Sequence, residues 1–150
     1  MGGMRQQSNM CKIGGNNLKR KNLLGDADDF INQSVGAASD MYKEYRTMKS
    51  HNFKSTDDYY HCKANYEATS RGPIGEATSR GLGNLKENFD YQWNMYYKGL
   101  SKKDAQWDMK HDLKVNEDGR RRAKSLLYES SQDACADYRN KNKKLPNKYW

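Results

Sequence analysis

Apolar side chains recur every three or four positions through much of the chain, which is the pattern of amphipathic helices. The first such run predicts a helix over about 28–49, followed by a connector over 50–54. We expect its stripe to face the core, because burying a large apolar side chain contributes roughly 1.5–3 kcal/mol. The stripe, widened by Phe30, Ala37 and Met41, comprises Ile31, Val35, Ala38, Tyr42, Tyr45 and Met48.

The phrase EATSRG occurs twice, at 67–72 and 76–81. The first copy ends a helix that Ser55 can cap, because Gly72 suits a left-handed helix end and Pro73 cannot continue the helix. A phosphate-binding loop is excluded, since no Gly-Lys-Ser/Thr follows and no strand precedes. A tandem repeat stays open on these residues alone. The helical period continues through the second copy, at Ile74, Ala77, Leu82, Leu85, Phe89, Trp93 and Tyr96.

The C-terminal third is also expected to be helical. Gly99 is a plausible helix stop, and Ser101 with Asp104 forms a variant capping box for a helix over about 102–115. A last helix is predicted over 120–138, with Ala123, Leu126, Leu127 and Ala134 as its buried set. Strand-like alternation is absent and only two prolines occur, so the predicted fold class is all-α.

Composition and apolar periodicity divide the chain into an N-terminal segment and a helical domain. Residues 1–27 are rich in Gly, Asn and Lys without a period, which predicts a disordered basic arm before a helical domain over 28–150. The formal net charge of +8 favours acidic partners such as nucleic acid, anionic lipid or heparin-like polymers, although a solvated basic surface explains it equally well. The candidate polyanion-binding residues are Arg120, Arg121, Arg122, Lys141, Lys143 and Lys144.

Three cysteines, Cys11, Cys62 and Cys135, form no close pair. Because an odd number cannot close a disulfide framework, free thiols are predicted. No run is long and apolar enough to span a bilayer, and the N-terminus lacks the apolar middle of a secretory signal.

Catalytic and metal motifs are not recognisable in the sequence. Asp57 and His61 stand four residues apart on a predicted helix, but they supply two ligands where zinc sites use three or four. An ion pair on one helix face is the favoured interpretation, with no metal and no cofactor. No serine or cysteine sits in a nucleophile motif, so the sequence gives no signal for an enzyme.

The block Asp40–Gly75 resembles the serum amyloid A family. The match needs no gap from Phe30 to Asn88 and resumes weakly near Asn116 and at the C-terminus, with an insertion around 94–114. The residues that carry it are Asp40, Met41, Tyr42, Tyr45, Met48, Asn52, Phe53, Asp57, Tyr59, Tyr60, His61, Asn65, Tyr66, Arg71, Gly72, Pro73, Gly75, Leu145, Pro146, Lys148 and Tyr149.

The resemblance implies a four-helix bundle with further C-terminal helical segments and a tail, ending near Tyr149, that wraps across the helices. Arg71 beside the Gly72–Pro73 turn is expected to tie the bundle to this tail. The second EATSRG fills positions that the family already has, so it is not an inserted duplication. The family further implies an extracellular acute-phase protein that forms homo-oligomers and binds lipid or lipoprotein surfaces, retinol-like apolar ligands and heparin.

For lipid, the resemblance points to the helix over 28–49. Its inserted residues would be Ile31, Val35, Met41 and Tyr45, with Lys43, Arg46 and Lys49 at the head groups. Since the same stripe is predicted to form the core, lipid binding is expected to be weak and to need anionic lipid. The alternative is an effector domain like those at the C-termini of bacterial polymorphic toxins, acting on nucleic acid or membranes.

Overall fold

The computed structural model describes residues 14–52 and 56–142. Within these ranges it is built of helices alone, which confirms the predicted all-α class. The elements are α1 (Gly14–His51), α2 (Asp57–Ser70), α3 (Pro73–Tyr96), α4 (Lys102–Ala123), α5 (Ser131–Ala134) and α6 (Ala136–Asn142).

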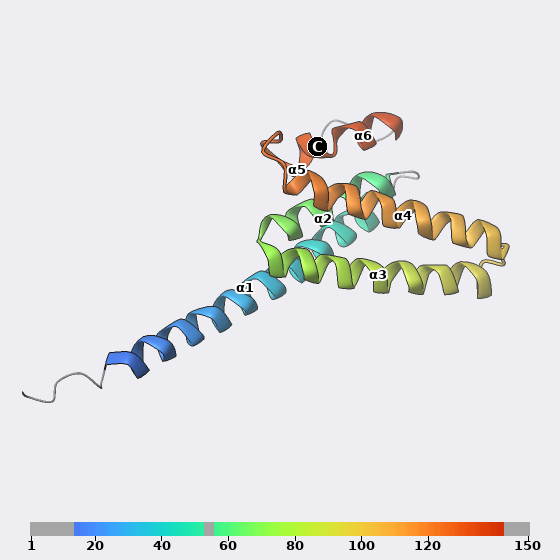
Figure 1. Ribbon diagram of the computed structural model, residues 1–150. Helices are drawn as coiled ribbons and strands as arrows, with labels where there is room; N and C mark the ends of the chain where they lie inside the picture. The colour runs from blue at the N-terminus through green and yellow to red at the C-terminus, as the bar shows by residue number, and fades with distance from the viewer. Residues whose placement is uncertain (1–13, 53–55, 143–150) are drawn as a thin grey trace, which may run out of the picture.

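Helix α2 lies at the centre of the bundle and packs against α1, α3 and α4, while the short α5 and α6 close over α2 (Figure 1). The first half of α1 projects away from the bundle. Helices α1 and α3 run in parallel: Gln33 accepts a hydrogen bond from the Ile74 amide at one end, and Met48 and Phe89 line one cleft at the other. Large apolar side chains are exposed on both helices of this parallel pair.

The turn between α2 and α3 forms as predicted. Gly72 has φ 122°, a conformation open to glycine and strained for other residues, and Pro73 begins α3. The second EATSRG lies inside α3, so the two copies are two helix segments. Arg71 forms a bidentate pair with Asp40 of α1, at 2.5 and 3.0 Å. The tail to which Arg71 was expected to bind lies outside the described residues.

Replacing Gly72 by Ala is expected to lower the free energy of unfolding by more than about 1 kcal/mol, because Ala is strained at positive φ. An ideal Cβ there would also lie 2.5 Å from Gln33 Oε1. Gly81→Ala is the matched control: this helical glycine has no neighbour within 4 Å of its Cβ position, so Ala should stabilise by up to about 1 kcal/mol. Urea unfolding of both variants checks the pair, and equal effects would contradict the account.

Two helix boundaries differ from the predictions. Helix α1 begins at Gly14 rather than near Asp28, so the backbone of 14–27 is helical and not a disordered arm. Helix α4 continues to Ala123, through Gly119, which packs where α4 meets α2 and where a Cβ would lie 2.3 Å from the Cys62 carbonyl oxygen. Gly119 is thus a contact point between two helices.

The predicted last helix over 120–138 is wrong. Residues 124–130 leave the helical path, and Ser130 then caps α5 by accepting a hydrogen bond from the Asp133 amide at 3.1 Å. Leu126 and Leu127, predicted to be buried, are 103% and 81% exposed. The predicted start of α4 is confirmed, since the Ser101 side chain accepts from the Asp104 amide.

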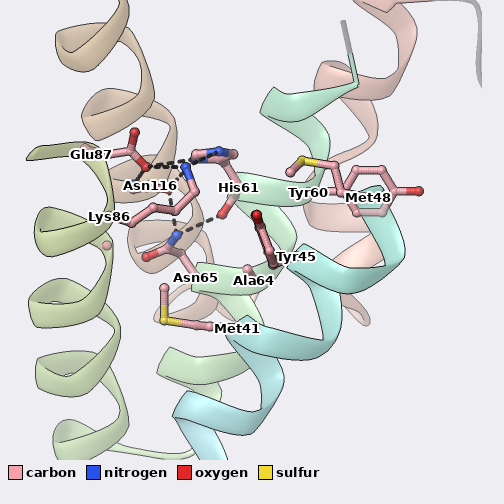
Figure 2. Close-up of a pocket in the computed structure, with 11 residues that line it drawn as sticks. Met41, Tyr45, Met48, Tyr60, His61, Ala64, Asn65, Lys86, Glu87 and Asn116 are labelled. Atoms are coloured by element: carbon pink, nitrogen blue, oxygen red, sulfur yellow. Dashed lines mark hydrogen bonds and ion pairs between the residues drawn. The ribbon is translucent and has the colours of Figure 1, made fainter. Parts of the chain in front are cut away.

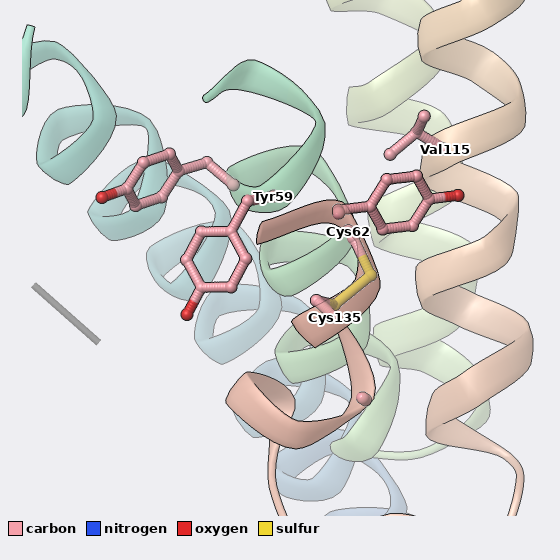
Figure 3. Packing of buried hydrophobic residues seen from close by; sticks show 7 residues of the cluster. Tyr59, Cys62, Val115 and Cys135 are labelled. Carbon is pink, nitrogen blue, oxygen red and sulfur yellow. A yellow bond between two sulfur atoms is a disulfide. The ribbon is translucent and has the colours of Figure 1, made fainter. Parts of the chain in front are cut away.

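The compact apolar cluster lies where α5 and α6 meet α2 and α4 (Figure 3). Its buried members include Tyr59, Val115 and Tyr138, and at its centre Cys62 is joined to Cys135 in a disulfide. The prediction of free thiols is therefore wrong. An odd number of cysteines prevents all of them from pairing, but it does not prevent one disulfide between residues 73 apart. Cys11 lies outside the described residues.

Candidate functional site: an exposed apolar face over a polar core

The apolar stripe of α1 faces solvent. Val35 is 63% exposed, and Phe30, Ile31, Tyr42 and Tyr45 are exposed as well. The prediction that this stripe forms the core is wrong for these five residues, whereas Ala37 is buried and Met41 and Met48 are half-buried. The opposite side of α1 packs on α2 and α3, where Ala37 and the carboxylate residue Glu44 are fully buried.

Helix α3 has the same reversed arrangement. Its largest apolar side chains are exposed, while the side that packs on α2 and α4 consists of small and polar residues. The exposed set is Leu82, Leu85, Phe89, Trp93 and Tyr96, and the buried set is Gly75, Ser79, Gly83, Glu87 and Asn94.

The two exposed stripes meet. Tyr45 of α1 lines one cleft with Phe89 and Trp93 of α3, and the Phe89, Trp93 and Tyr97 rings stack in sequence along α3. The stripes lie on two parallel neighbouring helices and come together at this cleft. We call this surface the α1–α3 apolar face and define it by Phe30, Ile31, Val35, Tyr42, Tyr45, Leu82, Leu85, Phe89, Trp93 and Tyr96.

A buried hydrogen-bond network explains how polar sides can face inward. Asn116 of α4 accepts hydrogen bonds from Asn65 at 2.8 Å and from His61 Nδ1 at 3.1 Å. Arg120, 2% exposed, donates to Asn65 at 2.6 Å. Burial outweighs Coulombic attraction to Glu87, and the pKa of His61 lies below its ordinary value. The neutral imidazole suits this enclosed position.

Glu87 and Lys86 of α3 complete the network (Figure 2). Lys86 Nζ lies 3.2 Å from Glu87 Oε1 and 2.7 Å from Asp90, and the Asn116 amide also donates to Glu87 Oε1. Burial and the nearby Glu87 carboxylate raise the pKa of Asp112 to about 8. Because Asn65, Asn116, Arg120 and Glu87 Oε1 have polar partners on neighbouring helices, large apolar side chains are not needed between them.

Comparison with known proteins matches the sequence of this chain to one family. The family described as "Serum amyloid A protein" matches residues 28–149. The chain belongs to the serum amyloid A family. Relatives include the serum amyloid A-3 protein of Bos taurus, 32% identical over 61% of this chain and 70% of its own length. The serum amyloid A protein of Ovis aries is 33% identical over 61% of this chain and 81% of its own length. That of Canis lupus familiaris is 33% identical over 65% of this chain and 75% of its own length.

The lipid-binding residues suggested by the serum amyloid A resemblance lie mostly on the α1–α3 apolar face. Ile31, Val35 and Tyr45 belong to it, whereas Met41 is half-buried and lines a pocket beneath. The three basic candidates are exposed. Arg46 stacks over Tyr42 and Lys49 over Tyr45, at 6.0 and 5.4 Å from the ring centroids, and Lys43 lies on the same helix.

The polyanion candidates separate into different environments. Arg120 is buried in the network, and Arg122 is held by Asp137 and by the Ala134 carbonyl. Both arginines therefore hold the serum amyloid A fold together instead of presenting a basic surface. Arg121 is exposed beside Asp118. Of the lysines, Lys141 lies in α6 and the side chains of all three are outside the described part.

The expected Asp57–His61 ion pair does not form among the described residues. His61 points away into the network, where Asn116 and Glu87 are its neighbours, while Asp57 is exposed. The roles of Glu87 and Asn116 in this network were not predicted from the sequence. One signal was present: Ser79, Gly83 and Glu87 are spaced by four, which places small and polar residues on one side of α3.

Proposed function

We propose that this serum amyloid A family member binds lipid or lipoprotein-type surfaces through the α1–α3 apolar face. The observation that carries the proposal is the outward orientation of both large apolar stripes over a core that is polar and hydrogen-bonded. Contiguous exposed apolar surface of this kind marks binding sites in soluble proteins.

The sequence predicted that one stripe of α1 would be needed both for the core and for lipid contact. A stripe buried in the core could bind a bilayer only if the bundle opened. Val35 and Leu85 are already 63% and 69% exposed, so insertion requires no core residue to move. We therefore expect binding to neutral lipid as well, with Arg46 and Lys49 adding affinity for anionic head groups.

Location outside the cell is part of the proposal. The Cys62–Cys135 disulfide is typical of oxidising compartments, and the related proteins are named for serum. No helix in the described ranges has the length and apolar character to cross a membrane. Nothing in the comparisons supports the bacterial effector alternative.

Self-association follows from the same surface. In the absence of lipid, the α1–α3 apolar face of one copy would be covered by that of a second, as the family resemblance to oligomeric proteins suggests. Lipid and a second copy would then compete, and added vesicles should dissociate the oligomer. Binding of anionic polymers and of small apolar ligands is proposed from the family alone.

Vesicle flotation tests the face directly. The variant Val35→Gln/Leu85→Gln/Phe89→Gln keeps the charge and should lower affinity for neutral phosphatidylcholine vesicles by at least about 100-fold, because three large apolar contacts are lost. Leu126→Gln/Leu127→Gln is the matched control: these leucines are at least as exposed but lie outside the face. Equal losses in both variants, or no loss in the first, would contradict the proposal.

A further inference from the structure

Acidic and imidazole groups converge at the floor of the cleft between the end of α1, the start of α2, the end of α3 and α4. Five aspartates and three lysines line this cleft, so it has an acidic excess in a chain of net charge +8. Asp58 comes from α2, Glu87 from α3, and His111 and Asp112 from α4. Tyr45, Phe89 and Trp93 of the α1–α3 apolar face line the same cleft, but none of the acidic or imidazole groups belongs to that face.

Two groups of potential metal ligands share one residue. In the first, Asp58, His111 and Asp112 each offer a ligand atom, and these atoms lie within 4.8 Å of one another. In the second, His61, Glu87 and Asp112 do the same. Ligand atoms around zinc sit about 2.0–2.2 Å from the ion, so modest side-chain rotations bring such groups to coordination distance. Asp57, which the sequence analysis had considered with His61, belongs to neither group.

The buried side of this cluster contains an unpartnered polar atom. Glu87 is 1% exposed, and although its Oε1 accepts hydrogen bonds, its Oε2 has no partner among the described residues. The dashed interactions in Figure 2 reach one carboxylate oxygen of Glu87, and none is drawn to the other. The Asp112 carboxyl lies against Glu87. Two carboxyl groups in contact and largely removed from water call for a cation or a proton between them.

The negative charge of Glu87 is partly neutralised by a neighbouring lysine, Lys86. Lys86 Nζ faces Glu87 Oε1, Asp90 and His61 Nε2, at 3.2, 2.7 and 3.4 Å, and so serves one side of Glu87. His61 Nδ1 is held by Asn116. On the open side, His111 Nε2 and Asp58 Oδ1 are 2.9 Å apart.

We propose that this cluster binds one divalent metal ion of the zinc class. Asp112 is the shared ligand, with Asp58 and His111 on the cleft side and Glu87 on the buried side. The ion takes the place of the hydrogen bond between His111 Nε2 and Asp58 Oδ1, and His111 coordinates it through Nε2 as the tautomer that carries its proton on Nδ1. The mixed nitrogen and oxygen set suits Zn²⁺ or Co²⁺ better than Ca²⁺, which takes oxygen ligands only.

Calorimetric titration of the tag-free full chain with Zn²⁺ tests the site. We expect one ion per chain, and Asp112→Asn and His111→Gln should each weaken binding by more than about tenfold. Asp28→Asn is the control, since Asp28 is an exposed carboxylate on the projecting part of α1. Unchanged affinity in either cluster variant would overturn the proposal.

A second readout needs no substitution in the cluster. The Trp107 ring stacks on His111, with centroids 5.5 Å apart and planes 13° apart. In a Trp93→Phe/Trp150→Phe background, Co²⁺ should quench Trp107 fluorescence with the same affinity as its visible absorption bands appear, and Zn²⁺ should reverse the quenching. Absence of the Co²⁺ bands and of quenching in this folded protein would overturn the proposal.

Discussion

Removing the Cys62–Cys135 disulfide is expected to lower the free energy of unfolding by about 4–5 kcal/mol. The bond joins residues 73 apart, and in the chain-entropy view a loop of that length restricts the unfolded state by this amount. It also fastens α5 and α6, which span 4 and 7 residues and are too short to be stable as isolated helices. Loss of the bond should therefore release both from α2.

Urea unfolding with and without reductant measures this effect. A Cys62→Ala/Cys135→Ala variant should match the reduced protein, apart from a further small loss of packing. Cys11→Ser serves as the control and should unfold like the unsubstituted chain in the absence of reductant. A midpoint that reductant leaves unchanged would show that the disulfide does not contribute to stability.

Replacing Lys63 by Met is expected to cost 3 kcal/mol or more at neutral pH, because it leaves a buried carboxylate unpaired. Glu44 of α1 has a 2% exposed side chain, and its Oε1 lies 2.8 Å from Lys63 Nζ of α2. Glu67 also lies near Lys63, with 3.5 Å between its Oε1 and Lys63 Nζ. As a carboxylate, Glu67 cannot neutralise Glu44 once Lys63 is replaced. The change removes the cation on which the α1–α2 contact depends.

The loss should depend on pH with a defined sign. Burial, only partly offset by Lys63, raises the pKa of Glu44 above its ordinary value of 4.5. A carboxyl group whose folded-state pKa is raised takes up its proton first in the native state, so stability is lost as pH rises through that pKa. Without Lys63 the pKa rises further. The deficit should thus be largest at neutral pH and shrink towards pH 4.5.

The double variant Glu44→Gln/Lys63→Met is the control for this prediction. A neutral amide at position 44 removes the buried charge, so most of the lost stability should return and the added pH dependence should vanish. Thermal unfolding at several pH values distinguishes the outcomes. A Lys63→Met deficit that is constant with pH would mean that packing, and not the charge of Glu44, is responsible.

Local signals in the sequence predicted the helix boundaries that depend on local chemistry. Gly72 and Pro73 marked the α2–α3 turn, and Ser101 with Asp104 marked the start of α4, because backbone conformation and capping are set by neighbouring residues. The packing role of Gly119 was not predicted, for the opposite reason. Its role is to admit the Cys62 carbonyl of another helix, and no local pattern reveals such a contact.

The orientation of α1 and α3 could not be predicted from amphipathicity. Periodicity shows that a helix has an apolar and a polar side, but which side is buried depends on the partners offered by other helices. Here Asn65, Asn116 and Arg120 satisfy one another and make a polar interior stable. The packing of the helices brings Cys62 and Cys135 together, and a count of cysteines cannot predict that contact.

Quenching by brominated lipid tests most directly whether the α1–α3 apolar face meets a bilayer. Trp93 lies on the face and Trp107 lies on α4 outside it, so each can serve as the single tryptophan of an otherwise Phe-substituted chain. With vesicles of brominated phosphatidylcholine, the Trp93 protein should be quenched and its emission should shift to the blue, while the Trp107 protein should change little. Equal quenching of both, or quenching of Trp107 alone, would contradict the account.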